Sequence, residues 1–116
     1  MKRDMDLIRL LLQDIEGEEP KPDLSGCSDR QVFYHLELMQ DAGLIVVGFL
    51  RGGSGEIVGV EPGLRLTNLG HDFLEASRSE TLWAKFRQAV VKVGGSVSVP
   101  VAIELLKKLV KTELGL

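Results

Sequence analysis

Hydrophobic residues recur at helical spacing in five stretches of the chain, and three shorter stretches follow the pattern of strands. In the first helical stretch, an apolar stripe begins after Asp4, which can cap a helix, and stops at Gly17. The polar residues on the other side of this stretch are expected to face water; they are Asp6, Arg9, Gln13 and Asp14. The sequence predicts helices over residues 4–16, 28–42, 68–77 and 81–93 and from residue 98 onward.

The stretch 28–42 carries the clearest helix signals. Ser28 and Gln31 have the spacing of a capping box, in which each side chain accepts a hydrogen bond from the other residue's backbone N–H. Gly43 follows as a residue that readily adopts the left-handed conformation at a helix end. One face is expected to join the core, and it holds Val32, His35, Leu36 and Met39.

Two apolar stretches after this helix predict a β-hairpin. They run over residues 44–50 and 56–60 and flank the sequence R-G-G-S-G, which favours a turn. A third short strand is expected over residues 64–66. In contrast, residues 18–27 contain Pro20, Pro22 and Gly26, so this segment is expected to be a loop without a full helix.

The order helix, loop, helix, hairpin is typical of a winged-helix domain. We therefore expect an α+β fold, a helix-turn-helix variant whose second helix is reduced and whose hairpin forms the wing. The chain is short enough to be a single domain over residues 1–116. Residues 1–77 would form the winged-helix core, and residues 78–116 would form a C-terminal helical extension.

The two C-terminal helices have apolar faces that suggest close packing. Trp83 and Phe86 are expected in the core, and Thr67 and Ser98 cap the third and fifth helices. The last helix is expected to turn Ala102, Leu105, Leu106, Leu109 and Val110 inward and Lys107, Lys108 and Lys111 outward. This apolar stripe is broad enough to form the interface of a homodimer through the C-terminal helices. The alternative is a helical hairpin, in which the two helices fold back on the domain within one chain.

Charge is distributed unevenly along the chain, whose formal net charge is -3. Residues 1–80 contain eight Lys and Arg against fifteen Asp and Glu, whereas residues 81–116 contain six against two. The segment that resembles a DNA-binding domain is therefore the acidic segment. Because affinity for DNA comes largely from cations that neutralise phosphates, we expect any DNA binding to be weak and salt-dependent.

Catalysis, metal binding and membrane insertion have little support in the sequence. Cys27 is a single cysteine, and neither His35 nor His71 belongs to a spaced metal or catalytic motif, so we expect no enzyme activity, no cofactor and no metal site. The glycine-rich turn lacks the Lys-Ser/Thr and the following helix of a phosphate-binding loop. No apolar run approaches the length of a membrane span, and a cytoplasmic location is expected.

Two resemblances extend this interpretation. The strings Y-H-L-E-L-M-Q-D-A-G-L-I and L-R-L-T-N-L-G-H-D-F-L resemble the recognition-helix and post-wing sequences of arsenic-repressor-type and multiple-antibiotic-resistance-type winged-helix regulators. Over nearly its full length the chain resembles a family of small uncharacterised bacterial and prophage proteins, through blocks at residues 1–9, 65–74 and 94–116. The second resemblance implies a winged-helix fold and a cytoplasmic or phage-encoded setting, and it implies no activity.

Two functions remain for this sequence. The first is a DNA-binding transcriptional regulator, in which the helix over residues 28–42 enters the major groove. In that role Arg30, Gln31 and Tyr34 would lie nearest the bases, and Arg51 and Ser54 of the wing would contact the DNA backbone. The alternative is a non-catalytic protein-protein interaction module, a phage or host adaptor, that docks through Phe33, Tyr34 and Leu38 or through its acidic surface.

Overall fold

The computed structural model describes residues 2–116, so Met1 of the N-terminal block lies outside the described residues. It is a mixed α+β structure with five helices and two small antiparallel sheets in the described chain. The elements in order are α1 (Met5–Glu16), α2 (Asp29–Asp41), β1 (Ile45–Val46), β2 (Phe49–Arg51), β3 (Ile57–Val60), β4 (Arg65–Leu66), α3 (Asn68–Ser77), α4 (Glu80–Lys92) and α5 (Val99–Glu113).

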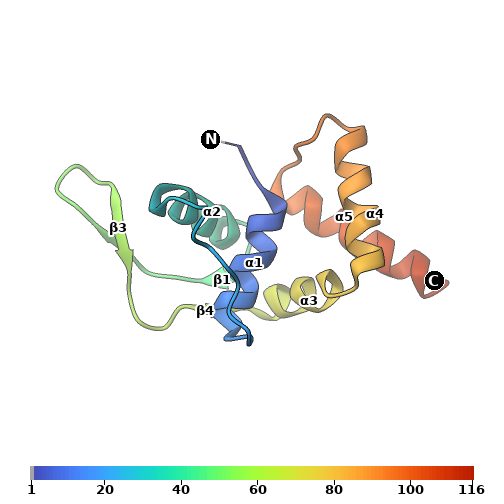
Figure 1. The fold of residues 1–116 in the computed structure, drawn as a ribbon, viewed down its shortest axis with the longest axis horizontal. Coiled ribbons are helices and arrows are strands. Elements are labelled where there is room, and N and C mark those ends of the chain that lie inside the picture. The colour runs from blue at the N-terminus through green and yellow to red at the C-terminus, as the bar shows by residue number, and fades with distance from the viewer. Residues whose placement is uncertain (1) are drawn as a thin grey trace.

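Helix α1 lies at the centre of the fold, between α2 with the hairpin on one side and α3 to α5 on the other (Figure 1). Its predicted N-cap is confirmed, because the Asp4 carboxylate accepts hydrogen bonds from the backbone N–H groups of Asp6 and Leu7. Gly17 ends the helix in the left-handed conformation, as predicted. The buried face of α1 consists of Leu7, Ile8, Leu11 and Leu12. A single core therefore extends from α2 through α1 to the C-terminal helices.

The four strands form one long hairpin in two parts. At its base β1 pairs with β4, and farther out β2 pairs with β3; both pairings are antiparallel. The continuous strand expected over residues 44–50 is interrupted at Val47 and Gly48, which corrects the prediction. The reason is local: the Val47 N–H donates to Oε1 of Gln40 on α2 at 2.9 Å and not to a neighbouring strand. The outer part projects away from the body at one end of the molecule (Figure 1).

Helix α2 begins as predicted, with the complete capping box between Ser28 and Gln31. His35, Leu36 and Met39 are buried, whereas Val32 is only half-buried. His35 Nε2 accepts a hydrogen bond from the backbone N–H of Asp4 at 2.8 Å, and its Nδ1 lies 2.7 Å from the Gln31 carbonyl oxygen. Only a ring protonated at Nδ1 and free of a proton at Nε2 satisfies both contacts. This neutral imidazole ties the start of α1 to α2.

The loop that precedes α2 bears out the expectation for residues 18–27, which contain no helix. Leu24 and Cys27 of this loop are half-buried and pack against the core. The segment between α1 and α2 is therefore irregular and is held to the core by these two apolar side chains. Within residues 2–116, none of the helices has the length and hydrophobicity needed to cross a membrane.

The C-terminal helices complete the core as a folded-back pair. Trp83 and Phe86 are fully buried and stacked, with ring centroids 4.7 Å apart, as expected for core residues. Of the α5 residues predicted to face inward, Ala102 and Leu106 are buried, Leu105 and Leu109 are half-buried against the core, and Val110 is half-buried. Helix α5 packs against both α3 and α4, and this two-sided contact sets its rotation. Its buried residues are Val99, Ala102, Ile103 and Leu106.

Candidate functional site

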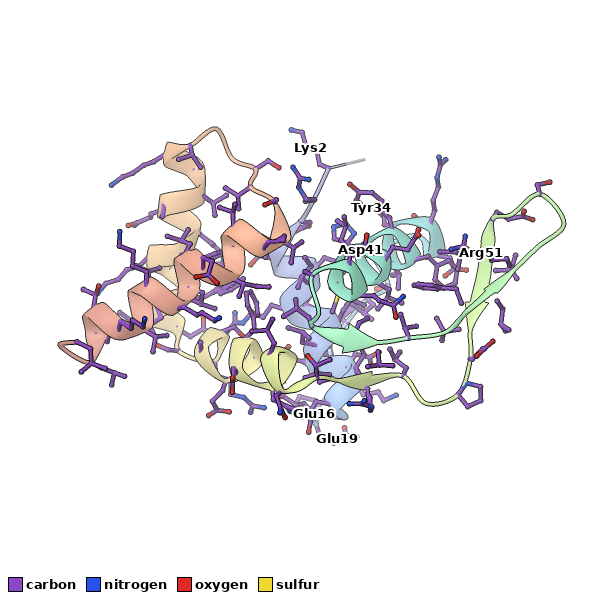
Figure 2. The ribbon with its side chains drawn as sticks, turned by 180° about the vertical axis from the view of Figure 1, so that it is seen from behind. Lys2, Glu16, Glu19, Tyr34, Asp41 and Arg51 are labelled. Carbon is purple, nitrogen blue, oxygen red and sulfur yellow. The ribbon has the colours of Figure 1, made fainter. Side chains whose placement is uncertain are left out.

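Four of the seven residues proposed from sequence line one open groove, which lies between α2 and the β2–β3 hairpin and has a volume of about 850 Å³. They are Arg30, Phe33, Tyr34 and Arg51. We call this feature the α2–hairpin groove. Figure 2 shows Tyr34 on α2 and Arg51 on the hairpin. The other groove residues with charged or apolar side chains are Asp29, Glu37, Glu56, Ile57 and Val58.

The remaining three proposed residues have other surroundings. The Gln31 amide oxygen accepts hydrogen bonds from the Ser28 backbone and hydroxyl, so this side chain is committed to the cap of α2. Leu38 is half-buried against the core and does not line the groove. Ser54 lies at the exposed tip of the hairpin, where its backbone N–H donates to Glu56 Oε2 at 2.9 Å. The structure therefore does not gather these three with the groove residues.

Arg51 is held within the hairpin by several contacts. Its Nη1 donates to the Gly55 carbonyl oxygen at 3.0 Å, and its guanidinium lies 6.0 Å from the centroid of the Phe49 ring. Its Nη2 is 3.8 Å from Glu37 Oε2 on α2, in an ion pair whose two side chains are about half exposed. Arg51 thus connects the hairpin to α2, and the Glu37 carboxylate offsets part of its positive charge.

The charge of the α2–hairpin groove is mixed, with an acidic excess. Its lining contains three carboxylates, from Asp29, Glu37 and Glu56, and two guanidinium groups, from Arg30 and Arg51. Apolar side chains lie among these groups: Phe33, Tyr34 and Ile57 are half-buried and Val58 is exposed. The groove therefore offers hydrophobic contacts surrounded by charges of both signs, with negative charge predominating.

Sequence reasoning missed the acidic residues of this groove and the apolar hairpin residues Ile57 and Val58. Helical spacing puts Glu37 on the same exposed face of the helix as Arg30 and Tyr34. Helical spacing shows that these side chains share a face, and it does not show what lies opposite them. The interruption of the strand at Val47 and Gly48, which separates the base of the hairpin from the part that lines the groove, involves the tertiary contact of Val47 with Gln40 and has no clear sequence signal.

A second polar cluster joins α1 to α4. Asp6 is exposed as expected but also binds α4, whereas the Arg9 side chain is only 13% exposed, which corrects the expectation that it faces water. Asp6 Oδ1 accepts hydrogen bonds from Trp83 Nε1 at 2.8 Å and from Arg87 Nη2 at 2.7 Å. Partial burial raises the pKa of Asp6, but the hydrogen bonds from Arg87 and Trp83 and the nearby positive charges together lower it below its ordinary value. Asp6 is therefore a charged link between two helices.

Arg9 makes the second half of this cluster. Its Nη2 donates to Glu80 Oε1 at 2.7 Å, and its guanidinium lies 5.2 Å from the centroid of the Trp83 ring. The hydrogen bond from Arg9, together with its charge, lowers the pKa of Glu80. These contacts anchor α4 on α1 and give Asp6 and Arg9 of the N-terminal block a structural role.

The cysteine and the two histidines are not gathered in one site. His35 is buried with both ring nitrogens in contact with backbone groups, whereas His71 is exposed and its Nδ1 lies 3.4 Å from Glu16 Oε2. Cys27 is half-buried beneath the loop before α2. Over residues 2–116, no three His, Cys, Asp or Glu side chains are grouped so that they could hold a metal ion.

Comparison with known proteins places the chain in a family. The profile of the DUF2513 family, described as a hypothetical protein, matches residues 2–96, and the chain belongs to this family. The chain is also similar to an uncharacterised protein of Haemophilus influenzae, with 28% identity over 119 residues that cover 97% of this chain and 94% of the relative. No solved structure matches the chain.

Proposed function

We propose that this DUF2513 protein is a non-catalytic protein-docking module on a variant winged-helix fold, with the α2–hairpin groove as its docking surface. The fold proposal is supported by the order of α1, α2 and the hairpin, and by the position of the hairpin beside the exposed face of α2. Such a scaffold presents a helix and a hairpin together, and it serves DNA or protein partners according to the residues it exposes.

One observation carries the choice of a protein partner: the α2–hairpin groove holds more carboxylates than guanidinium groups. A DNA-binding surface needs an excess of cations, because counterion release at the phosphates supplies most of its non-specific affinity. Here Arg51 is engaged by Glu37 and the Gly55 carbonyl, and Asp29 adjoins Arg30 at the start of α2. A phosphate backbone in this groove would meet three negative charges at close range.

The side chains of the groove also favour a particular kind of protein segment. Phe33 and Tyr34 from α2 and Ile57 and Val58 from the hairpin offer apolar contacts to an anchoring side chain. Aromatic residues in a partly enclosed groove are common centres of protein interfaces. The surrounding carboxylates suit Lys or Arg beside that anchor. The expected partner is therefore a segment with apolar anchors flanked by basic residues.

DNA binding is the second candidate, favoured by the resemblance of α2 and the sequence after the hairpin to winged-helix regulators. In that function the same face would contact DNA through Arg30, Tyr34 and Arg51. Binding would be weak and would fall steeply with salt, since few cations oppose the local acidic excess. Sub-nanomolar binding to DNA that persists at moderate salt would contradict the protein-docking proposal.

The two candidates respond in opposite directions to one substitution, Glu37→Lys. In the docking function, this change places a positive charge where a basic segment should bind, so partner capture should decrease. In the DNA function, it removes a repulsive charge and adds an attractive one, so affinity for DNA should increase. Asp41→Lys is the matched control, because Asp41 lies one turn farther along the same helix, is exposed and does not line the groove.

The experiment uses a photo-reactive benzoylphenylalanine in place of Tyr34, in the full chain expressed in its native cells. A specific protein adduct that Glu37→Lys reduces and Asp41→Lys preserves supports docking in the α2–hairpin groove. The purified variants are tested in parallel on a fluorescent mixed-sequence duplex at low and moderate salt. Nucleic-acid adducts, together with a rise in duplex affinity that is specific to Glu37→Lys, would replace the docking proposal with DNA binding.

A further inference from the structure

A second hollow lies on the opposite part of the molecule, between α3 and α5, and has a different chemistry. Its apolar wall from α3 includes Leu69, Phe73 and Ala76, and its wall from α5 includes Ile103, Leu106 and Val110. Its volume is about 250 Å³, and it is open to solvent on one side. Phe73, Ile103 and Leu106 are buried and form the deep part, while the other three are half-buried. We call this feature the α3–α5 hollow.

Charged side chains stand only at the lip of the α3–α5 hollow. Lys107 and Lys111 are exposed and lie one turn apart on α5, whereas Asp72 belongs to α3. Lys107 Nζ is 3.5 Å from Glu104 Oε1 in an exposed contact along the same helix, which contributes little. Among the ion pairs of residues 2–116, none includes Lys111. The lip on α5 is therefore positive.

This combination of an apolar interior and a cationic lip fits a small anionic amphiphile. We infer that the α3–α5 hollow binds a free carboxylate with a hydrocarbon tail, with the tail between Phe73 and Leu106 and the carboxylate beside Lys107 and Lys111. Burial of the tail supplies the favourable hydrophobic term, and charge-assisted hydrogen bonds from the lysines fix its orientation. Asp72 repels the carboxylate from the α3 lip and so favours the same orientation.

The volume limits the size of the ligand. An apolar protein cavity of about 150 Å³ accommodates benzene, with six carbons, so about 250 Å³ corresponds to roughly ten. A monocarboxylate of medium chain length therefore fits. The volume is too small for the apolar face of a partner helix, which would insert several large side chains. The lining shares no residue with the α2–hairpin groove, so this inference is independent of the proposed function.

Titration of the full chain with sodium octanoate tests the inference, with calorimetry for affinity and two-dimensional amide NMR for location. The expected result is saturable binding with shifts centred on residues 69–76 and 103–111. Acetate tests the need for the tail, and 1-octanol, which keeps the tail and lacks the charge, tests the need for the carboxylate. Both should bind at least about tenfold more weakly than octanoate.

Two pairs of variants make the test specific. Lys107→Gln with Lys111→Gln should weaken octanoate binding about tenfold, whereas Lys108→Gln, on the same helix but outside the lining, should change it less than about twofold. Ala76→Trp should fill the hollow and abolish binding, whereas Val101→Trp, at an exposed position of α5, should leave it intact. Far-ultraviolet circular dichroism verifies that each variant is folded.

Several results would overturn the inference. The first is a set of amide NMR shifts that map outside residues 69–76 and 103–111. The second is 1-octanol that binds as tightly as octanoate. The third is an octanoate affinity that is the same in the Lys107→Gln, Lys111→Gln double variant as in the Lys108→Gln control. Binding to vesicles of anionic phospholipid without saturable binding of octanoate would assign the lysines to a membrane surface. If the unmodified chain forms dimers as its concentration rises and these dimers do not bind octanoate, the hollow is instead occupied by a second copy of the chain.

Discussion

Gly70 of α3 lies directly against the carbonyl oxygen of Leu44 at the start of the hairpin, so closely that a Cβ atom at position 70 would overlap that oxygen. Thr67 holds the same junction: its hydroxyl donates to the Gly43 carbonyl oxygen at 2.5 Å and accepts from the Gly70 N–H at 3.1 Å. The sequence T-N-L-G therefore joins the cap of α3 to a close contact between helix and hairpin.

Gly70→Ala should lower the free energy of unfolding by about 1–3 kcal/mol, because the contacted atoms belong to the backbone and must shift. Gly53→Ala, in the hairpin turn with open space around it, is the matched control and should change stability by less than about 0.5 kcal/mol. Urea denaturation of both proteins measures the difference. Equal changes in the free energy of unfolding for the two variants would show that α3 can move away from Leu44 without loss of stability.

Leu36→Ala should lower the free energy of unfolding by about 2–5 kcal/mol, because Leu36 is only 4% exposed and its removal leaves a cavity beneath α2. Arg30→Ala, on the exposed side of the same helix, should cost little. Chemical denaturation compares the two. Small losses in both variants would mean that α2 presents a different face to the core.

His35→Leu should destabilise the protein although it adds a hydrophobic side chain to a buried position. The substitution removes the acceptor of the part-buried backbone N–H of Asp4, and the loss of such a hydrogen bond costs about 0.5–1.5 kcal/mol. His71→Leu is the comparison, because His71 is exposed and its contact with Glu16 lies at the surface. Hydrogen exchange at Asp4 should accelerate in the first variant alone; an unchanged rate would show that water replaces His35.

The Asp6 link predicts a specific dependence of stability on pH. Its pKa in the folded chain is below the ordinary value of 3.8, so the folded protein binds this proton less readily than the unfolded chain. The stabilisation is present above the unfolded pKa and is lost as pH falls through the lower folded pKa. Asp6→Asn retains an oxygen for Trp83 and lacks the charge.

Unfolding of both proteins between about pH 7 and pH 2 tests this sign. The unmodified chain should exceed Asp6→Asn in stability by a constant amount above about pH 5, and the difference should shrink toward the acid end. Asp41→Asn provides the control for the loss of an exposed carboxylate on another helix. A difference in the free energy of unfolding between the unmodified and Asp6→Asn proteins that becomes larger toward acid pH would contradict the lowered pKa of Asp6.

A homodimer through the C-terminal helices stays a prediction. Ala102, Ile103 and Leu106 pack within one chain, so a dimer would use what α5 leaves exposed, with Val101 at 54% exposure as its largest apolar contribution before the C-terminal turn. Sedimentation equilibrium of the full chain measures association. Val101→Glu should dissociate such a dimer and Lys108→Glu should not. An unmodified chain that is monomeric at high concentration would contradict the prediction of a dimer.

The sequence by itself determined the elements whose signals are local. The capping box at Ser28 and the N-caps at Asp4, Thr67 and Ser98 depend on residues within one turn of each other, so their positions follow from spacing alone. The same holds for Gly17, for the core positions of Leu36 and Phe86, and for the loop over residues 18–27. These features need no information about what packs on the other side of a helix.

Only the tertiary structure decided which exposed residues meet. The break at Val47 depends on Gln40, seven residues earlier on α2, and it directs the outer hairpin across Tyr34 and Glu37. Asp6 and Arg9 have the spacing of solvated residues, yet their partners Arg87 and Glu80 lie more than 70 positions away. Helical periodicity reports one face of one helix, whereas a groove or an ion pair between elements depends on how two faces are brought together.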